Sequence, residues 1–480
     1  MAPAGLARRR HSPEPSRSAG IDQRSSALQQ RRGDQSAFGT SNFRRTRSRS
    51  ATGPDMNEVA AANIAMMVLS ASLGINIIFW CTIGVIRFVS EFGSRNATGA
   101  LPSVRLADVA VVIPAHNEAI ALPKCIAALK QIIPARQIYV ASDGSRDATV
   151  AIARAAGCRA LDIQPNGGKA KAIDQAIRHY RLCDRYKAVL IQDADSEIDQ
   201  HYFRHALPLF DDPGVAAVAG HVLSRWRDHR WPSIDMLFAA YRTRLYRILQ
   251  TAFQYGQSWK WTNVTYIAPG FASMYRTDAL RFIDITAPGL VIEDFNMTFE
   301  VQHKRLGRVA YSPLARCSSE DPFTLNDYRK QVQRWYLGFW QTVWRHGIWP
   351  SRFWLSLGGL LTELMVISLF ALALPFAAIF YLATGIEIPA ISLNELAVHP
   401  VSPLGLLALF LAVDYSLTFV VAVIECRPSL LVYGLAFPFI RLLDAALFLR
   451  ALLKSLSAKS DGRWISPERY VPVVLDGRKT

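Results

Sequence analysis

The sequence predicts an α/β domain with a parallel sheet, joined to membrane-spanning helices. Between residues 105 and 325, short apolar runs alternate with helical patterns, and polar residues stand where the expected strands end. Outside that region, apolar stretches are long enough to cross a bilayer, which takes about 20 residues. A ligand is expected at the carboxyl edge of the sheet, where the loops that follow parallel strands meet.

The α/β domain is expected to begin with a buried strand, DVAVVIP at residues 108–114. A helix follows in IALPKCIAALKQ (120–131), and a strand that ends in a glycine turn follows in QIYVASDGS (137–145). The next helix is DATVAIARAAG (147–157), and the next buried strand is YKAVLIQDADS (186–196), which closes on acidic residues.

The remaining segments divide by composition. Residues 59–89, and about three helices within residues 353–452, are expected to span the membrane, and residues 326–349 to form an interfacial amphipathic helix. Residues 1–55, rich in Arg, Ser and Pro, are expected to be a disordered tail because they cannot bury enough apolar surface to offset the ordering entropy. Residues 453–480 form a second tail.

Charge and cysteine usage limit the classes of function. The formal net charge is +16, and much of it lies in the first tail, whose RRTRSRS run could bind RNA or anionic lipid. A solvated basic tail explains that run more simply, so no nucleic-acid partner is expected. The six cysteines have no C-x-x-C spacing, which argues against a zinc site or a disulfide framework and fits a reducing compartment.

Acidic residues follow two of the expected strands. Asp193 and Asp195 stand two residues apart after an apolar strand, so both carboxylates can share a divalent cation. Mg²⁺ or Mn²⁺ is usually held by one or two carboxylates plus a phosphate. Asp143 ends an earlier strand, where carboxylates commonly accept hydrogen bonds from a nucleotide. A polar turn and a helix cap are the structural alternatives for these residues.

Two further stretches offer groups for catalysis. In QPNGGKAKAID, the glycines let the backbone approach a ligand closely, and Lys169 is placed to meet phosphate charge. In VIEDFN, the acidic pair Glu293 and Asp294 is flanked by apolar residues. Such a setting favours a carboxylate that acts as a general base.

A tryptophan-rich basic stretch, KQVQRWYLGFWQTVWRHGIWP, precedes the second group of apolar runs. On a helix, Gln331, Arg334 and Trp335 share one face because they lie three and four residues apart. Arg334 can pair with a diphosphate, and Trp335 can stack on a sugar. Three later tryptophans are expected in the lipid headgroup region, namely Trp340, Trp344 and Trp349.

In this order and context, these motifs resemble the processive family 2 glycosyltransferases, the membrane synthases of cellulose, hyaluronan, chitin and poly-N-acetylglucosamine. The resemblance covers roughly residues 108–346 and the membrane helices on both sides. The family signature is an aspartate in the nucleotide pocket, a DxD, a catalytic ED pair and Q-x-x-R-W. It is read here in Asp143, Asp193 with Asp195, Glu293 with Asp294, and Gln331 through Trp335. The resemblance implies a GT-A fold, a UDP-sugar donor, a growing glycan acceptor and Mg²⁺ or Mn²⁺.

The resemblance also implies a role for each site residue. Asp294 would deprotonate the acceptor hydroxyl, with Glu293 beside it. The residues around the donor and its metal would be Ala115, Glu118, Asp143, Lys169, Asp193 and Asp195. The residues around the acceptor and the diphosphate would be Gly270, Phe271, Gln331, Arg334 and Trp335.

Two positions depart from the family pattern. The usual DDGS begins here with Ser142, and the usual Thr before the ED pair is Ile292. Neither change removes a group that the mechanism requires, but both leave the sub-family and the sugar open.

Charged residues within the expected spans suggest a polar path through the membrane. Glu363, Asp414 and Arg441 lie near the middle of three apolar runs, where a lone charge costs about 2.5–3.5 kcal/mol on insertion scales. Asp414 and Arg441 are equidistant from the 426–429 link, so an antiparallel hairpin would pair them. The pair could simply lock two helices; otherwise Glu363 or Asp444 would face a path for the glycan.

The resemblance implies a multi-pass plasma-membrane enzyme with a cytoplasmic catalytic domain. It would polymerise N-acetylglucosamine or glucose into an exported β-linked polysaccharide, and a small accessory membrane subunit would be a further partner. The alternatives are a single-sugar transferase that acts on a lipid carrier and a catalytically silent scaffold. One span before the domain and three after it would place both basic tails outside, against the positive-inside rule. For the C-terminal tail, either one apolar run does not cross or residues 353–384 cross differently. For the first tail, translation that starts at Met56 would omit it.

Overall fold

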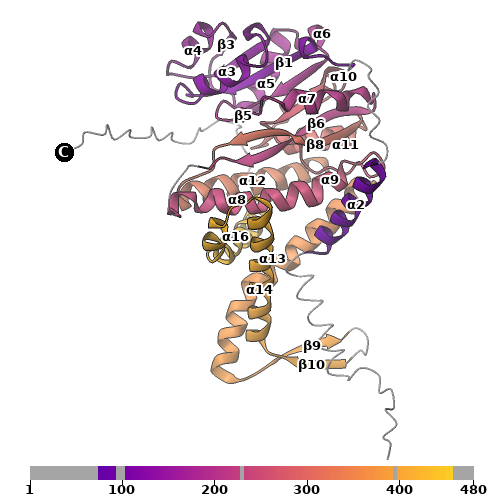
Figure 1. Ribbon diagram of the computed structural model, residues 1–480, viewed down its shortest axis with the longest axis vertical. Coiled ribbons are helices and arrows are strands. Elements are labelled where there is room, and N and C mark those ends of the chain that lie inside the picture. The colour runs from indigo at the N-terminus through magenta and orange to yellow at the C-terminus, as the bar shows by residue number, and fades with distance from the viewer. Residues whose placement is uncertain (1–73, 93–102, 227–231, 393–396, 458–480) are drawn as a thin grey trace, which may run out of the picture. The chain divides into compact units, whose positions relative to one another are not determined.

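The computed structural model describes residues 74–92, 103–226, 232–392 and 397–457 (Figure 1). The strands are β1 (Val109–Ala115), β2 (Ile138–Asp143), β3 (Arg159–Ile163), β4 (Ala188–Ile191), β5 (Glu197–Ile198), β6 (Val215–Ser224), β7 (Ser273–Arg276), β8 (Arg308–Ser319), β9 (Ile388–Ser392) and β10 (Ala397–Val401). The helices are α2 (Ile75–Phe92), α3 (Leu122–Lys130), α4 (Thr149–Ala155), α5 (Lys169–His179), α6 (Leu182–Arg185), α7 (Tyr202–Ala206), α8 (Leu237–Ile248), α9 (Tyr255–Gln257), α10 (Thr277–Leu280), α11 (Glu293–His303), α12 (Leu325–His346), α13 (Arg352–Thr384), α14 (Pro403–Ile424), α15 (Ser429–Gly434) and α16 (Phe437–Ser455). The predicted tail of residues 1–55 lies outside the described residues, as does the segment 458–480.

Eight strands form one mixed sheet in the order β3-β2-β1-β4-β7-β6-β8-β5. Strands β3, β2, β1 and β4 run parallel, so the α/β prediction is confirmed for this half. Strand β7 lies antiparallel between β4 and β6, so the sheet is mixed and the predicted parallel arrangement does not extend through it. The first residue of β7 pairs with the last residue of β4, so β7 runs in the opposite direction to β4.

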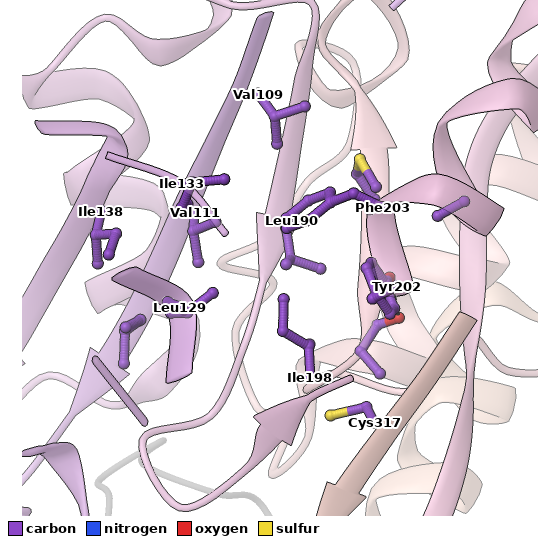
Figure 2. Packing of buried hydrophobic residues seen from close by; sticks show 14 of the residues in the cluster. Val109, Val111, Leu129, Ile133, Ile138, Leu190, Ile198, Tyr202, Phe203 and Cys317 are labelled. Carbon is purple, nitrogen blue, oxygen red and sulfur yellow. Dashed lines mark hydrogen bonds between the residues drawn. The ribbon is translucent and has the colours of Figure 1, made fainter. Parts of the chain in front are cut away.

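Both faces of the parallel half are covered by helices. Successive side chains of a strand point to opposite faces. Val109, Val111 and Ile113 of β1 pack with α3 and α7 in one cluster (Figure 2), whereas Ala110 and Val112 pack with α5 and α11 in another. Burial on both sides explains why these strands are continuous apolar runs in the sequence.

Helix α12 covers most of residues 326–349, for which an interfacial helix was predicted. Its N-terminus is capped by Thr324, whose side chain accepts a hydrogen bond from the backbone N–H of Asp327. It packs with α8, α14, α15 and α16 around a shared apolar cluster (Figure 1).

The tryptophans of this region are held more by protein than the sequence suggests. Trp340 is buried and contacts the ring of Phe448 in α16, with 5.3 Å between centroids. Trp349 stacks on His303 at 4.3 Å. Only Trp344 of the three expected headgroup tryptophans is largely exposed.

Three of the described helices, α2, α13 and α14, are long and apolar enough to cross a membrane. About three spans were expected within residues 353–452, and among the described residues of that range α13 and α14 have this length and composition. The run 430–452 is divided between α15 and α16, and α16 carries four charged residues, namely Arg441, Asp444, Arg450 and Lys454. Helix α2 begins at Ile75, so residues 59–73 of the first expected span lie outside the described part of the chain.

Candidate active site

The loops after β1 and β2 bring the predicted uridine-pocket residues together. Ala115, Glu118 and Asp143 are all buried. The two carboxylate oxygens of Asp143 accept hydrogen bonds from the backbone N–H groups of Gly167 and Gly168, at 2.8 and 2.7 Å. Asp143 thus holds the glycine loop that precedes α5, and each oxygen keeps a lone pair for a further donor.

The glycine loop and the turn after β2 both need glycine, for conformation and for space. Gly168 has φ +98°, and Gly144 has φ +64° with its missing Cβ position only 2.8 Å from the backbone nitrogen of Asn166. Asn166 also contacts His116, through Nδ2 and Nδ1 at 3.3 Å. Neither residue was singled out from the sequence, although Asn166 stands inside the stretch QPNGGKAKAID and His116 lies between the predicted site residues Ala115 and Glu118.

Lys169, the first residue of α5, lies between the two acidic motifs. Its Nζ is 2.8 Å from Oδ1 of Asp193 and 2.8 Å from Oε1 of Glu293. Removal from water alone would lower the pKa of Lys169, but the two carboxylates outweigh it and raise the pKa well above its usual range. A cation is thereby fixed beside the residues expected to meet the donor diphosphate.

The DxD residues follow β4 at the same sheet edge. Burial raises the pKa of Asp193 to about 6; Lys169 opposes that shift, and the neighbouring Asp195 carboxylate adds to it. Within the described residues, no group of three or more His, Cys, Asp or Glu side chains could hold a metal ion alone. Two adjacent carboxylates still fit Mg²⁺ or Mn²⁺, because these ions complete their shell with water and substrate phosphate.

The ED pair opens α11. Asp294 accepts hydrogen bonds from the backbone N–H of Phe295 at 2.7 Å and from that of Gly270 at 3.3 Å. Burial, reinforced by the Glu293 carboxylate, raises the pKa of Asp294 to about 7 against the opposing charge of Lys169. A carboxylate that titrates near neutrality is suited to general-base catalysis.

We expect kcat/KM for sugar transfer to rise with pH through about 7 and then to level, because Asp294 accepts a proton only when it is ionised. Initial rates measured in membranes from mildly acidic to alkaline pH would show this rise of kcat/KM. In Glu293→Gln the neighbouring negative charge is gone, so the rise of kcat/KM should occur at lower pH. A profile that is flat across neutrality in the native protein would contradict the assignment of Asp294 as the base.

Gly270 leaves room for the ED pair. A Cβ atom there would lie 3.2 Å from Cβ of Asp294 and 3.3 Å from Oε1 of Glu293. Phe271, the other predicted acceptor-site residue, follows directly and is half-buried. The backbone at this point therefore approaches the ED pair closely.

Helix α12 supports the loop that carries the ED pair. A Cβ atom at Gly338 would lie 2.9 Å from Cβ of Ile292, so the glycine permits close packing against the residue before the pair. The side chain of Gln341 accepts a hydrogen bond from the N–H of Val291 at 3.1 Å. The sequence analysis missed Gly338 and Gln341, which lie one and two helical turns beyond the Q-x-x-R-W motif.

The Q-x-x-R-W side chains meet an arginine that the sequence analysis also missed. Gln331 accepts a hydrogen bond from Nη2 of Arg242 at 2.7 Å, and the guanidinium of Arg242 lies 4.4 Å from the centre of the Trp335 ring. Arg334 of the same motif is exposed.

The four charged residues predicted along the membrane segments all have protein partners. Asp414 pairs with Arg441 at 2.6 Å, as expected from the hairpin, and also with Arg244 of α8 at 2.8 Å. Glu363 accepts a hydrogen bond from the backbone N–H of Asn76 at 2.9 Å. Asp444 accepts hydrogen bonds from two tyrosine hydroxyls of α8 and α12, those of Tyr241 and Tyr328.

The chain is similar to several known proteins. The family model "Glycosyltransferase like family 2" matches residues 107–338. Poly-beta-1,6-N-acetyl-D-glucosamine synthase of Staphylococcus aureus is 26% identical over 208 residues, which are 42% of this chain and 47% of that protein. Hyaluronan synthase of Streptococcus pyogenes is 29% identical over 252 residues, 48% of this chain and 57% of that protein. The chain thus spans about half the length of these curated relatives.

Among solved structures, the mannosyltransferase PcManGT from Pyrobaculum calidifontis, in complex with GDP-Man and Mn²⁺, matches with a TM-score of 0.49 and 16% identity. The match covers 84% of this chain and 100% of that chain. The family match spans every strand of the mixed sheet, the ED pair and the Q-x-x-R-W motif. Residues 107–338 therefore form a family 2 glycosyltransferase domain with a GT-A-like fold.

Proposed function

We propose that the chain is a membrane-embedded, inverting glycosyltransferase that polymerises sugar from a UDP-sugar donor into a β-linked polysaccharide. N-acetylglucosamine or glucose is the proposed sugar. The observation that carries the proposal is the bridge of Lys169 between Asp193 and Glu293, which joins the donor-side and base-side acids into one site. The match to two polysaccharide synthases supports the same reading.

The proposed reaction is a single displacement. Asp294 removes the proton of the acceptor hydroxyl while the hydroxyl oxygen attacks the anomeric carbon of the donor. The bond from that carbon to the diphosphate breaks, and UDP leaves with the bonding electrons. Lys169 and Arg334 offset the charge of the leaving group. A Mg²⁺ or Mn²⁺ ion held by Asp193 and Asp195 would add Lewis-acid stabilisation of the diphosphate, worth several kcal/mol.

Processive synthesis requires that the new chain end stay beside the base after each transfer. In the proposal, the ring of Trp335 stacks on the acceptor sugar and Gln331 hydrogen-bonds to it. Gly270 and Phe271 form the opposite floor of the acceptor site. The polymer then moves away from the site toward the membrane helices.

The proposed location is a plasma membrane, with the catalytic domain on the cytoplasmic side. If α13 leads away from the domain and α14 returns, the link that carries Arg427 lies on the domain's side of the membrane. The basic end of α16, with Lys454, lies there too. This arrangement satisfies the positive-inside rule for the C-terminal half, which four spans would not.

The deciding experiment supplies membranes that carry the protein with a panel of radiolabelled UDP-sugars and Mg²⁺ or Mn²⁺, and sizes the products. High-mass product from one donor would support the synthase and name its sugar. A short, lipid-extractable product would replace it with a lipid-carrier transferase. No transfer from any donor, in membranes that contain folded protein, would contradict the proposal.

A further inference from the structure

Arg242 is a buried charge in α8 that the proposed reaction does not use. It is 2% exposed, and three of the contacts of its guanidinium are of different kinds. Nη1 donates to Oδ1 of Asp321 at 3.1 Å, Nη2 donates to Oε1 of Gln331 at 2.7 Å, and the guanidinium carbon lies 4.4 Å from the centre of the Trp335 ring. One planar group therefore contacts both Q-x-x-R-W residues assigned to the acceptor.

Each contact restricts a different degree of freedom. The hydrogen bond to Oε1 fixes the amide of Gln331, so its Nε2 is the end that remains to donate to a ligand. The guanidinium over Trp335 holds one face of the indole by a cation–π contact. Asp321, itself only 6% exposed, supplies the countercharge that a buried arginine requires.

Helix α8 is anchored on either side of Arg242. The hydroxyl of Tyr241 donates to Asp444 of α16 at 2.9 Å. Arg244 donates to Oδ2 of Asp414 in α14 at 2.8 Å. Because its neighbours in the chain are tied to two other helices, Arg242 presents its guanidinium to α12 from a fixed position.

We propose that Arg242 is a positioning residue of the acceptor site, which sets the orientation of Gln331 and Trp335 for the incoming glycan. The inference rests on the proposed function, which assigns these two side chains to the acceptor. Lysine can still neutralise Asp321, but its single ammonium cannot hold an amide and an indole ring at once. Arg242→Lys therefore separates the positioning role from the charge.

In Arg242→Lys we expect the KM for a soluble oligosaccharide acceptor to rise by about tenfold or more, as for the loss of one charge-assisted hydrogen bond. The average product should become shorter, because chain ends dissociate sooner. The KM for the donor should stay within about twofold, since no donor-side residue is touched. Arg247→Lys is the matched control, because Arg247 lies on the same helix and pairs with Glu425 instead of α12.

The outcomes separate the inference from its alternatives. Unchanged acceptor KM and product length in folded Arg242→Lys would overturn it, and so would an equal rise in both KM values, which indicates general damage. Adding Gln331→Ala should cost little more acceptor affinity than the worse single variant, and full additivity would count against the inference. If the native protein makes no polymer, the proposed function fails. The inference, which rests on that function, then fails with it, whereas polymer synthesis with an unchanged acceptor KM in the variant overturns the inference alone.

Discussion

Asp294→Asn is expected to lower the rate of sugar transfer by about 10²–10⁴-fold, the usual contribution of a general base. The side chain keeps its size, and its single remaining oxygen can accept from only one of the N–H groups of Gly270 and Phe295, but it can no longer take a proton. Transfer would be measured with the productive donor in membranes that hold equal amounts of each variant. The exposed carboxylate of Asp278, changed to Asn, is the matched control and should leave the rate unchanged.

Stability should move in the opposite direction to activity in this variant. The pKa of Asp294 is about 7 in the folded protein and near 4 in the unfolded chain, so folding disfavours its ionised form. That cost is absent below the unfolded pKa and grows as pH rises toward 7. Neutral Asn removes it, so the variant should unfold at the same temperature as the native protein or higher at alkaline pH. Lost activity together with a clearly lower unfolding temperature would mean that Asp294 is mainly structural.

The convergence of the site could be predicted because of where its motifs lie along the sheet. Asp143 and Asp193 each follow a strand of the parallel half, and the carboxyl ends of such strands meet at one edge. The bridge of Lys169 to Glu293 could not be predicted. It requires the start of α11 to lie against the start of α5, and that depends on how the chain returns through the antiparallel strand β7.

The arginines of α8 and α16 also differ in whether their partners can be predicted from the sequence. Asp414 and Arg441 could be paired from the sequence because a short hairpin links them and their distances from the link are equal. Arg242 and Arg244 were not singled out from the sequence, since nothing near them in the chain indicates their partners. Their partners Gln331 and Asp414 lie 89 and 170 residues away. Only the packing of α8 against α12 and α14 brings them together.

Asp414→Asn is expected to destabilise the protein strongly, by about 3–5 kcal/mol, as when one member of a buried ion pair is removed. Asp414 is 1% exposed, and its two oxygens are engaged by different arginines, Arg244 and Arg441. Asparagine would leave both guanidinium groups without a countercharge. The amount of folded protein and its unfolding temperature in detergent would measure the effect. Glu363→Gln is the matched comparison, because Glu363 is half-buried and Gln keeps an acceptor for the N–H of Asn76.

The same two variants decide between a lock and a glycan path. On the path hypothesis, both substitutions reduce polymer export more than transfer of single sugars. The contacts of Asp414 favour the lock, in which Asp414→Asn lowers transfer and export together through loss of folded protein. A triple variant distinguishes the two hypotheses further. In it, apolar residues of similar size replace Arg244, Asp414 and Arg441 together, because such replacements of a buried ion cluster often restore stability. Recovered folding with normal export would establish the lock, whereas recovered folding and transfer without export would show that the charges line the route of the polymer.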